Sequence, residues 1–113
     1  MTATEAILIQ CTASSREEAR AIGRTLLEAK LAACVSIVGK AESHYWWRGA
    51  LEQASETVLL VKTTRERFDE VRRTILEHHS YEVPEIIALP VVAGHEPYLE
   101  WLAESVGGEE PGS

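Results

Sequence analysis

Hydrophobic positions along the chain form two kinds of segment. Some are short, nearly continuous apolar runs, and others are longer stretches in which apolar residues recur every three or four positions. Short runs bounded by polar or turn-forming residues predict buried strands, and the longer spacing predicts amphipathic helices. We therefore expect strands at 6–11, 33–38, 50–62 and 85–92, and helices at 15–30, 63–79 and 98–106. Residues 42–48 are also rich in strand formers.

Local signals support the helix starts. Ser15 with Glu18 and Thr63 with Glu66 have the spacing of a capping box, in which a hydroxyl and a carboxylate satisfy the first backbone amides of a helix. Pro97 suits the first turn of the last helix, where an amide hydrogen is not needed. These three signals predict where each helix begins.

The order of the elements predicts the fold. Strand, helix, strand, strand, helix, strand matches the split βαβ of an α+β, ferredoxin-like sandwich, here followed by an extra C-terminal helix. Right-handed crossovers place the third strand between the first and second, and the fourth beside the first. Pro90 lacks a donor, which favours an edge position for the fourth strand. The 113 residues fit one domain, 1–106, followed by a flexible tail, 107–113.

The second and third strands predict an unusually long hairpin. Residues 33–62 are almost continuously strand-like, with one turn near Gly49, and each arm would extend about 45 Å. A domain of this length has a radius of gyration of only about 13 Å. The hairpin must therefore bend sharply or project beyond its own protomer. A projecting hairpin would expose Tyr45, Trp46 and Trp47 unless neighbouring protomers cover them, which predicts a closed homo-oligomer.

Charge and composition exclude several classes of function. The net charge of −7 and the pI near 5.1 argue against a nucleic-acid partner, which needs clustered Lys and Arg. The N-terminus lacks a basic region, and no apolar run is long enough to span a membrane. These features predict a cytoplasmic protein with no membrane association.

Two imidazoles and several polar groups gather where the second helix gives way to the fourth strand, over residues 78–85. The predicted topology brings Cys11, at the end of the first strand, close to His78 and His79. A thiol and imidazoles suit copper or zinc. The alternative is that the histidines cap the helix and Cys11 is a small buried hydrophobe. Cys34 belongs at the opposite end of the sheet, so no disulfide with Cys11 is expected.

Other chemical motifs are absent from the sequence. There is no phosphate-binding glycine loop and no readable Ser/His/Asp order, so we expect no enzymatic activity. Glu82 and Glu85 flank Pro84, and surface carboxylates in that position are usually only solvated.

Five blocks of sequence resemble the CutA divalent-cation tolerance proteins: 31–35 (LAACV), 45–49 (YWWRG), 62–64 (KTT), 79–86 (HSYEVPEI) and 98–102 (YLEWL). The resemblance implies a ferredoxin-like protomer, a homotrimer and a role in tolerance of divalent metal ions, copper above all. It also implies kinship with the trimeric nitrogen-regulatory signal proteins. The family's copper ligands correspond here to Cys11, His78 and His79. Ser80 stands where the family usually has proline, which leaves the orientation of the imidazoles less constrained.

Three functions remain open at this point. The first is a metal-binding trimer that responds to copper or a similar ion. The second is a regulatory trimer that binds a small ligand in a cleft between subunits, lined by Trp47, Lys62, Tyr81 and Glu85. The third is a non-catalytic scaffold that anchors other proteins.

Overall fold

The computed structural model describes residues 5–107. In chain order the elements are β1 (Ala6–Ala13), α1 (Arg16–Glu28), β2 (Cys34–Trp47), β3 (Ala50–Thr64), the 3-10 turn η2 (Arg65–Arg67), α2 (Phe68–His78), β4 (Ile86–Pro90) and α3 (Glu96–Ser105). Within the described residues, no helix has the length and apolar character needed to cross a membrane. Apart from Gly107, the predicted tail lies outside the described residues.

The strands form one sheet in the order β2-β3-β1-β4, with every neighbouring pair antiparallel. Cys11 pairs with Leu59 of β3 on one side and with Ile86 of β4 on the other. The predicted α+β, ferredoxin-like topology is therefore confirmed, and the start of β4 lies beside the end of β1 as expected.

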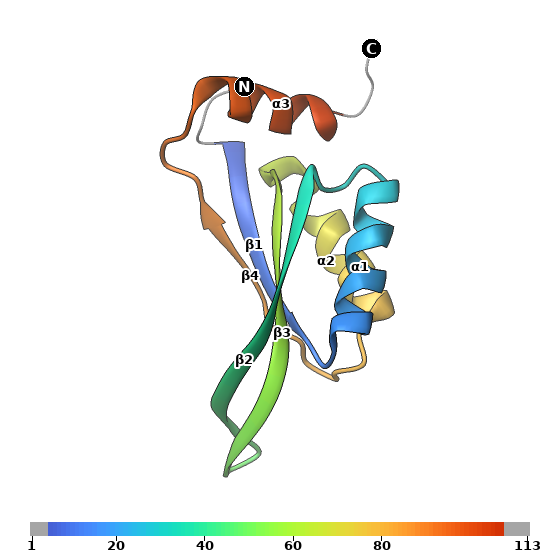
Figure 1. The fold of residues 1–113 in the computed structure, drawn as a ribbon, viewed down its shortest axis with the longest axis vertical. Coiled ribbons are helices and arrows are strands. Elements are labelled where there is room, and N and C mark those ends of the chain that lie inside the picture. The colour runs from blue at the N-terminus through green and yellow to red at the C-terminus, as the bar shows by residue number, and fades with distance from the viewer. Residues whose placement is uncertain (1–4, 108–113) are drawn as a thin grey trace.

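The main core lies between the sheet and two helices. Helices α1 and α2 pack against each other and cover one face of the sheet (Figure 1). Ile9 and Leu59 from the strands meet Ile22, Leu26 and Ile75 from the helices, and all five are fully buried. Buried residues recur at alternate positions of β1, at Ile7, Ile9 and Cys11, and four positions apart in α1, at Ile22 and Leu26, which is the spacing that predicted these elements.

Helix α3 crosses the far end of the sheet, as Figure 1 shows. Leu99 and Leu102 bury against Ala6 at the start of β1, in a second, smaller core. Pro97 lies in the first turn of this helix, as its missing amide hydrogen favours.

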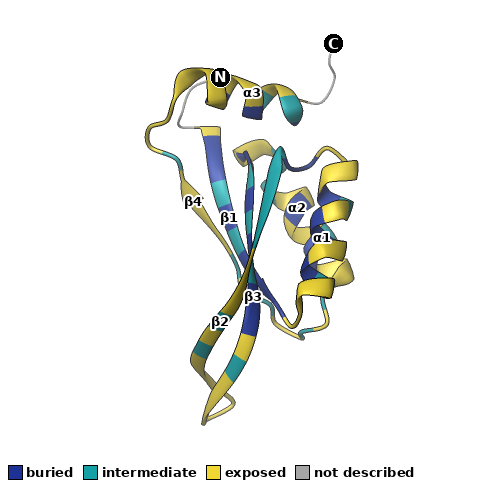
Figure 2. Cartoon of the chain, viewed as in Figure 1, coloured by how far each residue is buried: buried dark blue, intermediate teal, exposed yellow. Residues whose placement is uncertain are grey.

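The hairpin of β2 and β3 extends well beyond the rest of the chain. Pairing of β1 with β3 ends at Ala13 opposite Thr57, whereas β2 and β3 remain paired to Trp47 opposite Ala50. We call residues 39–56 the outer hairpin. It projects from the body and is mostly exposed (Figure 2), within a molecule of 50 × 26 × 22 Å.

The tip of the outer hairpin turns through Arg48 and Gly49. Both have positive φ values, 52° and 82°, which is the geometry of the tight turns that match strand twist. Gly49 was predicted as the turn, and Arg48 adopts the left-handed conformation at some cost in energy.

The two expected capping boxes have different outcomes. At α1, the Ser15 hydroxyl accepts a hydrogen bond from the Glu18 amide at 3.0 Å. The second prediction is wrong, because Thr63 is fully buried in β3 and its hydroxyl donates to the Leu31 carbonyl at 2.7 Å. Thr64 precedes the turn η2 without a side-chain cap.

Replacement of Thr63 by valine tests that buried hydrogen bond. The Leu31 carbonyl would lose its buried donor, so we expect the free energy of unfolding to fall by about 1–2 kcal/mol. Denaturant unfolding at fixed protein concentration measures this change. Thr25→Val is the matched control, because the Thr25 hydroxyl bonds a helix carbonyl, that of Ala21, on a more exposed surface. An equal loss in both variants would contradict the special role of Thr63.

Candidate functional site

The loop between α2 and β4, residues 79–85, lies against the end of β1. Helix α2 stops at His78, and His79 is already extended, with φ −99° and ψ 141°. Pro84 excludes the α conformation at Val83, so the helix cannot continue through the loop. The antiparallel pairing of β4 with β1 then brings this loop beside Thr12 and Ala13.

His79 joins the loop to the end of β1. Its Nε2 lies 2.6 Å from the Thr12 carbonyl oxygen, and its Nδ1 accepts a hydrogen bond from the Tyr81 amide at 3.0 Å. Because Nδ1 accepts, Nε2 carries the proton and donates. Both ring nitrogens are thus engaged, and neither offers a free lone pair to a metal ion.

Cys11 lies beneath the same carbonyl. Its side chain is fully buried, and its thiol contacts the Thr12 carbonyl oxygen at 3.6 Å. Burial, followed by the nearby carboxylates of Glu85, Glu18 and Glu56, raises the pKa of the Cys11 thiol to about 12. The thiol is therefore protonated at neutral pH, whereas a metal ligand must be a thiolate.

The expected metal trio does not fit a metal ion in this arrangement. Cys11 and His79 share one carbonyl, while His78 is exposed and its Nδ1 bonds the Thr74 carbonyl of its own helix at 2.8 Å. Within residues 5–107, no group of three or more His, Cys, Asp or Glu side chains is arranged to hold a metal. Both cysteines are free, as expected.

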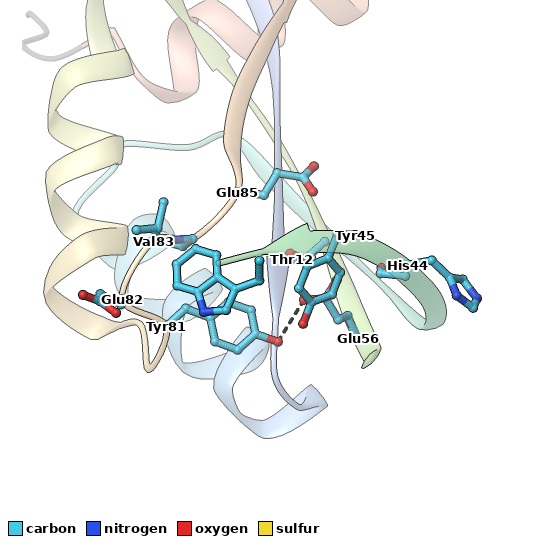
Figure 3. A pocket seen from close by; sticks show the side chains of 11 residues that line it. Thr12, His44, Tyr45, Glu56, Tyr81, Glu82, Val83 and Glu85 are labelled. Atoms are coloured by element: carbon cyan, nitrogen blue, oxygen red, sulfur yellow. Dashed lines mark hydrogen bonds between the residues drawn. The ribbon is translucent and has the colours of Figure 1, made fainter. Parts of the chain in front are cut away.

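A cleft opens on the other side of the loop, between it and the outer hairpin. Its volume is about 780 Å³, within the usual range for small-molecule sites. Figure 3 shows Tyr45, Tyr81 and Glu56 close together in the middle of the cleft, with His44 and Glu82 at its two sides. The lining residues are Thr12, Ser43, His44, Tyr45, Trp47, Glu56, Tyr81, Glu82, Val83, Pro84 and Glu85.

Glu56 forms the buried floor of the cleft. It is only 8% exposed, and its Oε2 accepts a hydrogen bond from the Tyr81 hydroxyl at 2.8 Å, drawn dashed in Figure 3. Burial and this bond to Glu56 raise the pKa of Tyr81, so the hydroxyl keeps its proton and remains a donor. A buried carboxylate is costly unless it is hydrogen-bonded, which makes Tyr81 its necessary partner.

Charged groups at the rim are paired across the chain. Arg48, at the hairpin tip, donates to Glu82 at 2.7 Å, and its guanidinium lies 5.1 Å from the centre of the Trp47 ring. Glu85 accepts a hydrogen bond from Gln10 at 2.8 Å. The rim therefore combines an aromatic face with carboxylates.

Glu18 fastens the loop to α1. Its Oε2 accepts from the Ser80 amide at 2.7 Å, and its Oε1 accepts from the amide and hydroxyl of Ser14, each at 2.9 Å. Partial burial acts to raise the pKa of Glu18, but these hydrogen bonds outweigh it and the net pKa is lowered. The carboxylate is therefore ionised in the folded protein at neutral pH, and it holds the loop that carries Tyr81.

The ligand cleft was expected between subunits, whereas this cleft lies within one protomer. Three of the four residues named for it, Trp47, Tyr81 and Glu85, line the cleft described here. Lys62 does not. It pairs with Leu8 and Cys34 toward the other end of the sheet, and its ammonium lies 5.8 Å from the Tyr98 ring. Sequence reasoning missed Glu56, because its hydrogen-bond partner Tyr81 lies 25 residues away along the chain.

Comparison with known proteins identifies the family. Residues 7–105 match the CutA1 divalent ion tolerance protein family. The divalent-cation tolerance protein CutA of Thermus thermophilus is 45% identical over 103 residues, which cover 91% of this chain and 98% of that protein. The chloroplastic protein CutA 1 of rice is 38% identical over 92% of this chain, which spans only 59% of the rice protein.

A solved structure agrees with the fold. The structure described as the periplasmic divalent cation tolerance protein CutA from Archaeoglobus fulgidus superposes with a TM-score of 0.86 at 44% identity. The match covers 89% of this chain and 98% of that one.

Tyr81→Phe tests the hydrogen bond that stabilises the floor of the cleft. The substitution leaves the buried Glu56 carboxylate without its donor, so we expect a loss of about 2 kcal/mol in the free energy of unfolding at pH 7. Denaturant unfolding at fixed protein concentration measures it. Tyr98→Phe, on the exposed face of α3, is the matched control. Equal stability of Tyr81→Phe and the wild type would contradict the assignment.

Proposed function

The chain belongs to the CutA1 divalent ion tolerance protein family, and on that premise we propose that it is a non-catalytic homotrimer that acts in the response to divalent metal ions. The observation that carries the assembly is the apolar surface of the projecting hairpin. The metal-ion role follows from the family, whose members are named for tolerance of divalent cations.

Exposed apolar side chains support self-association. Trp46 is 72% exposed and Leu51 65% exposed, and the two are paired across the outer hairpin. Val92, just beyond β4, is 84% exposed. Both β2 and β4 are edge strands with unsatisfied backbone groups. Contact with neighbouring protomers would cover the apolar surface and could pair these edges.

A closed ring is the arrangement that covers such a surface without forming fibres. The hairpin of one protomer would contact a different surface of the next, which is a head-to-tail contact. The family resemblance selects three members. We also propose a cytoplasmic location, a reducing compartment in which two free cysteines are ordinary.

Copper is the metal that the resemblance implies, and zinc is the alternative. Cys11, His78 and His79 stay the predicted ligands, although their folded arrangement does not fit. A metal there would require Cys11 to lose a proton and His79 to release the Thr12 carbonyl.

The cleft favours a second candidate function, that of a regulatory trimer that binds a small ligand. The cleft is large enough for such a ligand and joins apolar walls to carboxylates. A purely structural scaffold would not need an accessible void of this kind.

Trp46→Asp tests the assembly. A charge in the apolar patch should be incompatible with a buried contact, so we expect the wild type to have about three times the 12.5 kDa mass of the chain and the variant to dissociate. Sedimentation equilibrium at micromolar concentration measures both masses. Arg20→Asp, on the exposed side of α1, introduces the same side chain away from the hairpin and should stay assembled. A monomeric wild type would exclude the trimer.

Metal titration tests the predicted ligands. If Cys11 and His79 hold Cu²⁺ or Zn²⁺, the double variant Cys11→Ser/His79→Ala should bind at least about tenfold more weakly than the wild type. Binding should also strengthen between pH 6 and 8, because protons must leave the ligands. Calorimetry measures both effects, and Cys34→Ser is the control that keeps the site. Equal affinities in the double variant and the wild type would show that Cys11 and His79 are not the metal ligands.

A further inference from the structure

We propose that the cleft between the outer hairpin and loop 79–85 binds an organic cation, in the form of a primary ammonium or guanidinium head on an apolar body. The head would pair with the carboxylates of the lining, and the body would lie on its aromatic wall, which consists of Tyr45, Trp47 and Tyr81. This inference rests on the second candidate function above and names its class of ligand.

The charge of the cleft lining favours a positively charged ligand. The lining contains three carboxylates, those of Glu56, Glu82 and Glu85, and no Lys or Arg. Among residues 5–107, the partner of Glu82 is Arg48, whereas Glu56 and Glu85 form no ion pair. Negative charge without counter-charge repels an anion and attracts a cation, most strongly where the site excludes water.

Glu56 supplies a directed acceptor. The residue as a whole is only 8% exposed, and its Oε2 accepts the hydrogen bond from the Tyr81 hydroxyl. Its Oε1 accepts no hydrogen bond from any other residue in the described part of the chain. A buried charged acceptor that lacks a donor is costly, and an ammonium or guanidinium N–H would satisfy it.

The aromatic wall matches the rest of the ligand. Aromatic faces attract cations and also pack against hydrocarbon. Arg48 illustrates this preference within the protein, because its guanidinium lies over the Trp47 ring while it pairs with Glu82. The guanidinium of Arg48 is itself an organic cation, and it contacts one ring and one carboxylate of the cleft lining, those of Trp47 and Glu82.

A bare divalent ion suits this cleft less well. Calcium requires six to eight oxygen ligands and magnesium a near-ideal octahedron. No group of three or more ligating side chains in residues 5–107 is arranged for a metal. Val83 and Pro84, together with the aromatic wall, would leave much of a metal's coordination shell unfilled.

The experiment compares four probes with the same aromatic body on the full-length protein in its native assembly. They are phenethylamine, its N,N,N-trimethyl analogue, neutral 2-phenylethanol and anionic 3-phenylpropionate. Nitrogen-15 NMR follows the indole N–H of Trp47, which lines the cleft, with Trp101 on α3 as an internal reference. We expect phenethylamine to shift Trp47 at millimolar concentration and to bind about tenfold more tightly than 2-phenylethanol. The quaternary analogue should bind more weakly than phenethylamine, because it cannot donate to Glu56.

Charge-neutral variants locate the binding. Glu56→Gln and Glu85→Gln should each weaken phenethylamine at least about threefold. Glu100→Gln, the same change on exposed α3, should leave it unchanged. Should Glu56→Gln fail to fold, Glu85→Gln alone decides, because Glu85 is exposed.

Two other results would overturn the inference in different ways. Binding of the alcohol or the anion as tightly as the amine would keep the cleft as a ligand site but reject a cation. If no probe shifts the Trp47 signal at about 10 mM, the ligand-binding function itself is rejected. A cleft that is filled by a neighbouring protomer would give this result.

Discussion

Antiparallel pairing of β2 with β3 is the interaction on which the rest of the structure depends, because it continues after the support of β1 has ended at Thr57. A two-stranded ribbon is marginally stable in water, so the outer hairpin needs contacts beyond its own ladder. Within the protomer, Arg48 reaches Glu82, and Tyr81 reaches Glu56. Both contacts join the ribbon to loop 79–85. The cleft lies between the outer hairpin and loop 79–85, beside these two contacts. The length of the hairpin beyond β1 therefore both exposes apolar surface and forms one wall of the cleft.

The parts of the structure that follow from local pattern were predictable from the sequence. Periodicity gave the strands, helices and their order, and chain topology then brought Cys11 beside the loop that carries His79. The failures concern side-chain partners. Thr63 fits a capping box by spacing, but the register of β3 buries it. Glu56 could not be assigned to a cleft, because its partner Tyr81 is 25 residues away and the pairing depends on how far the hairpin leans toward the loop.

Glu56 also shows why the site has a cost in stability. A carboxylate held in the interior with one donor is less favourable than an apolar side chain of similar size. The protein compensates locally, with a hydroxyl on the floor of the cleft and with Glu18 fastening the loop that presents it.

The buried position of Cys11 has a consequence for oxidative chemistry. Peroxide attacks the thiolate form of cysteine and converts it to sulfenic and higher acids. Because burial and the nearby carboxylates raise the pKa of the Cys11 thiol to about 12, very little of it is thiolate at neutral pH. The fold thus protects this sulfur twice, by excluding the oxidant and by withholding the reactive species. The Cys11 thiol is therefore expected to stay reduced under conditions that oxidise exposed thiolates.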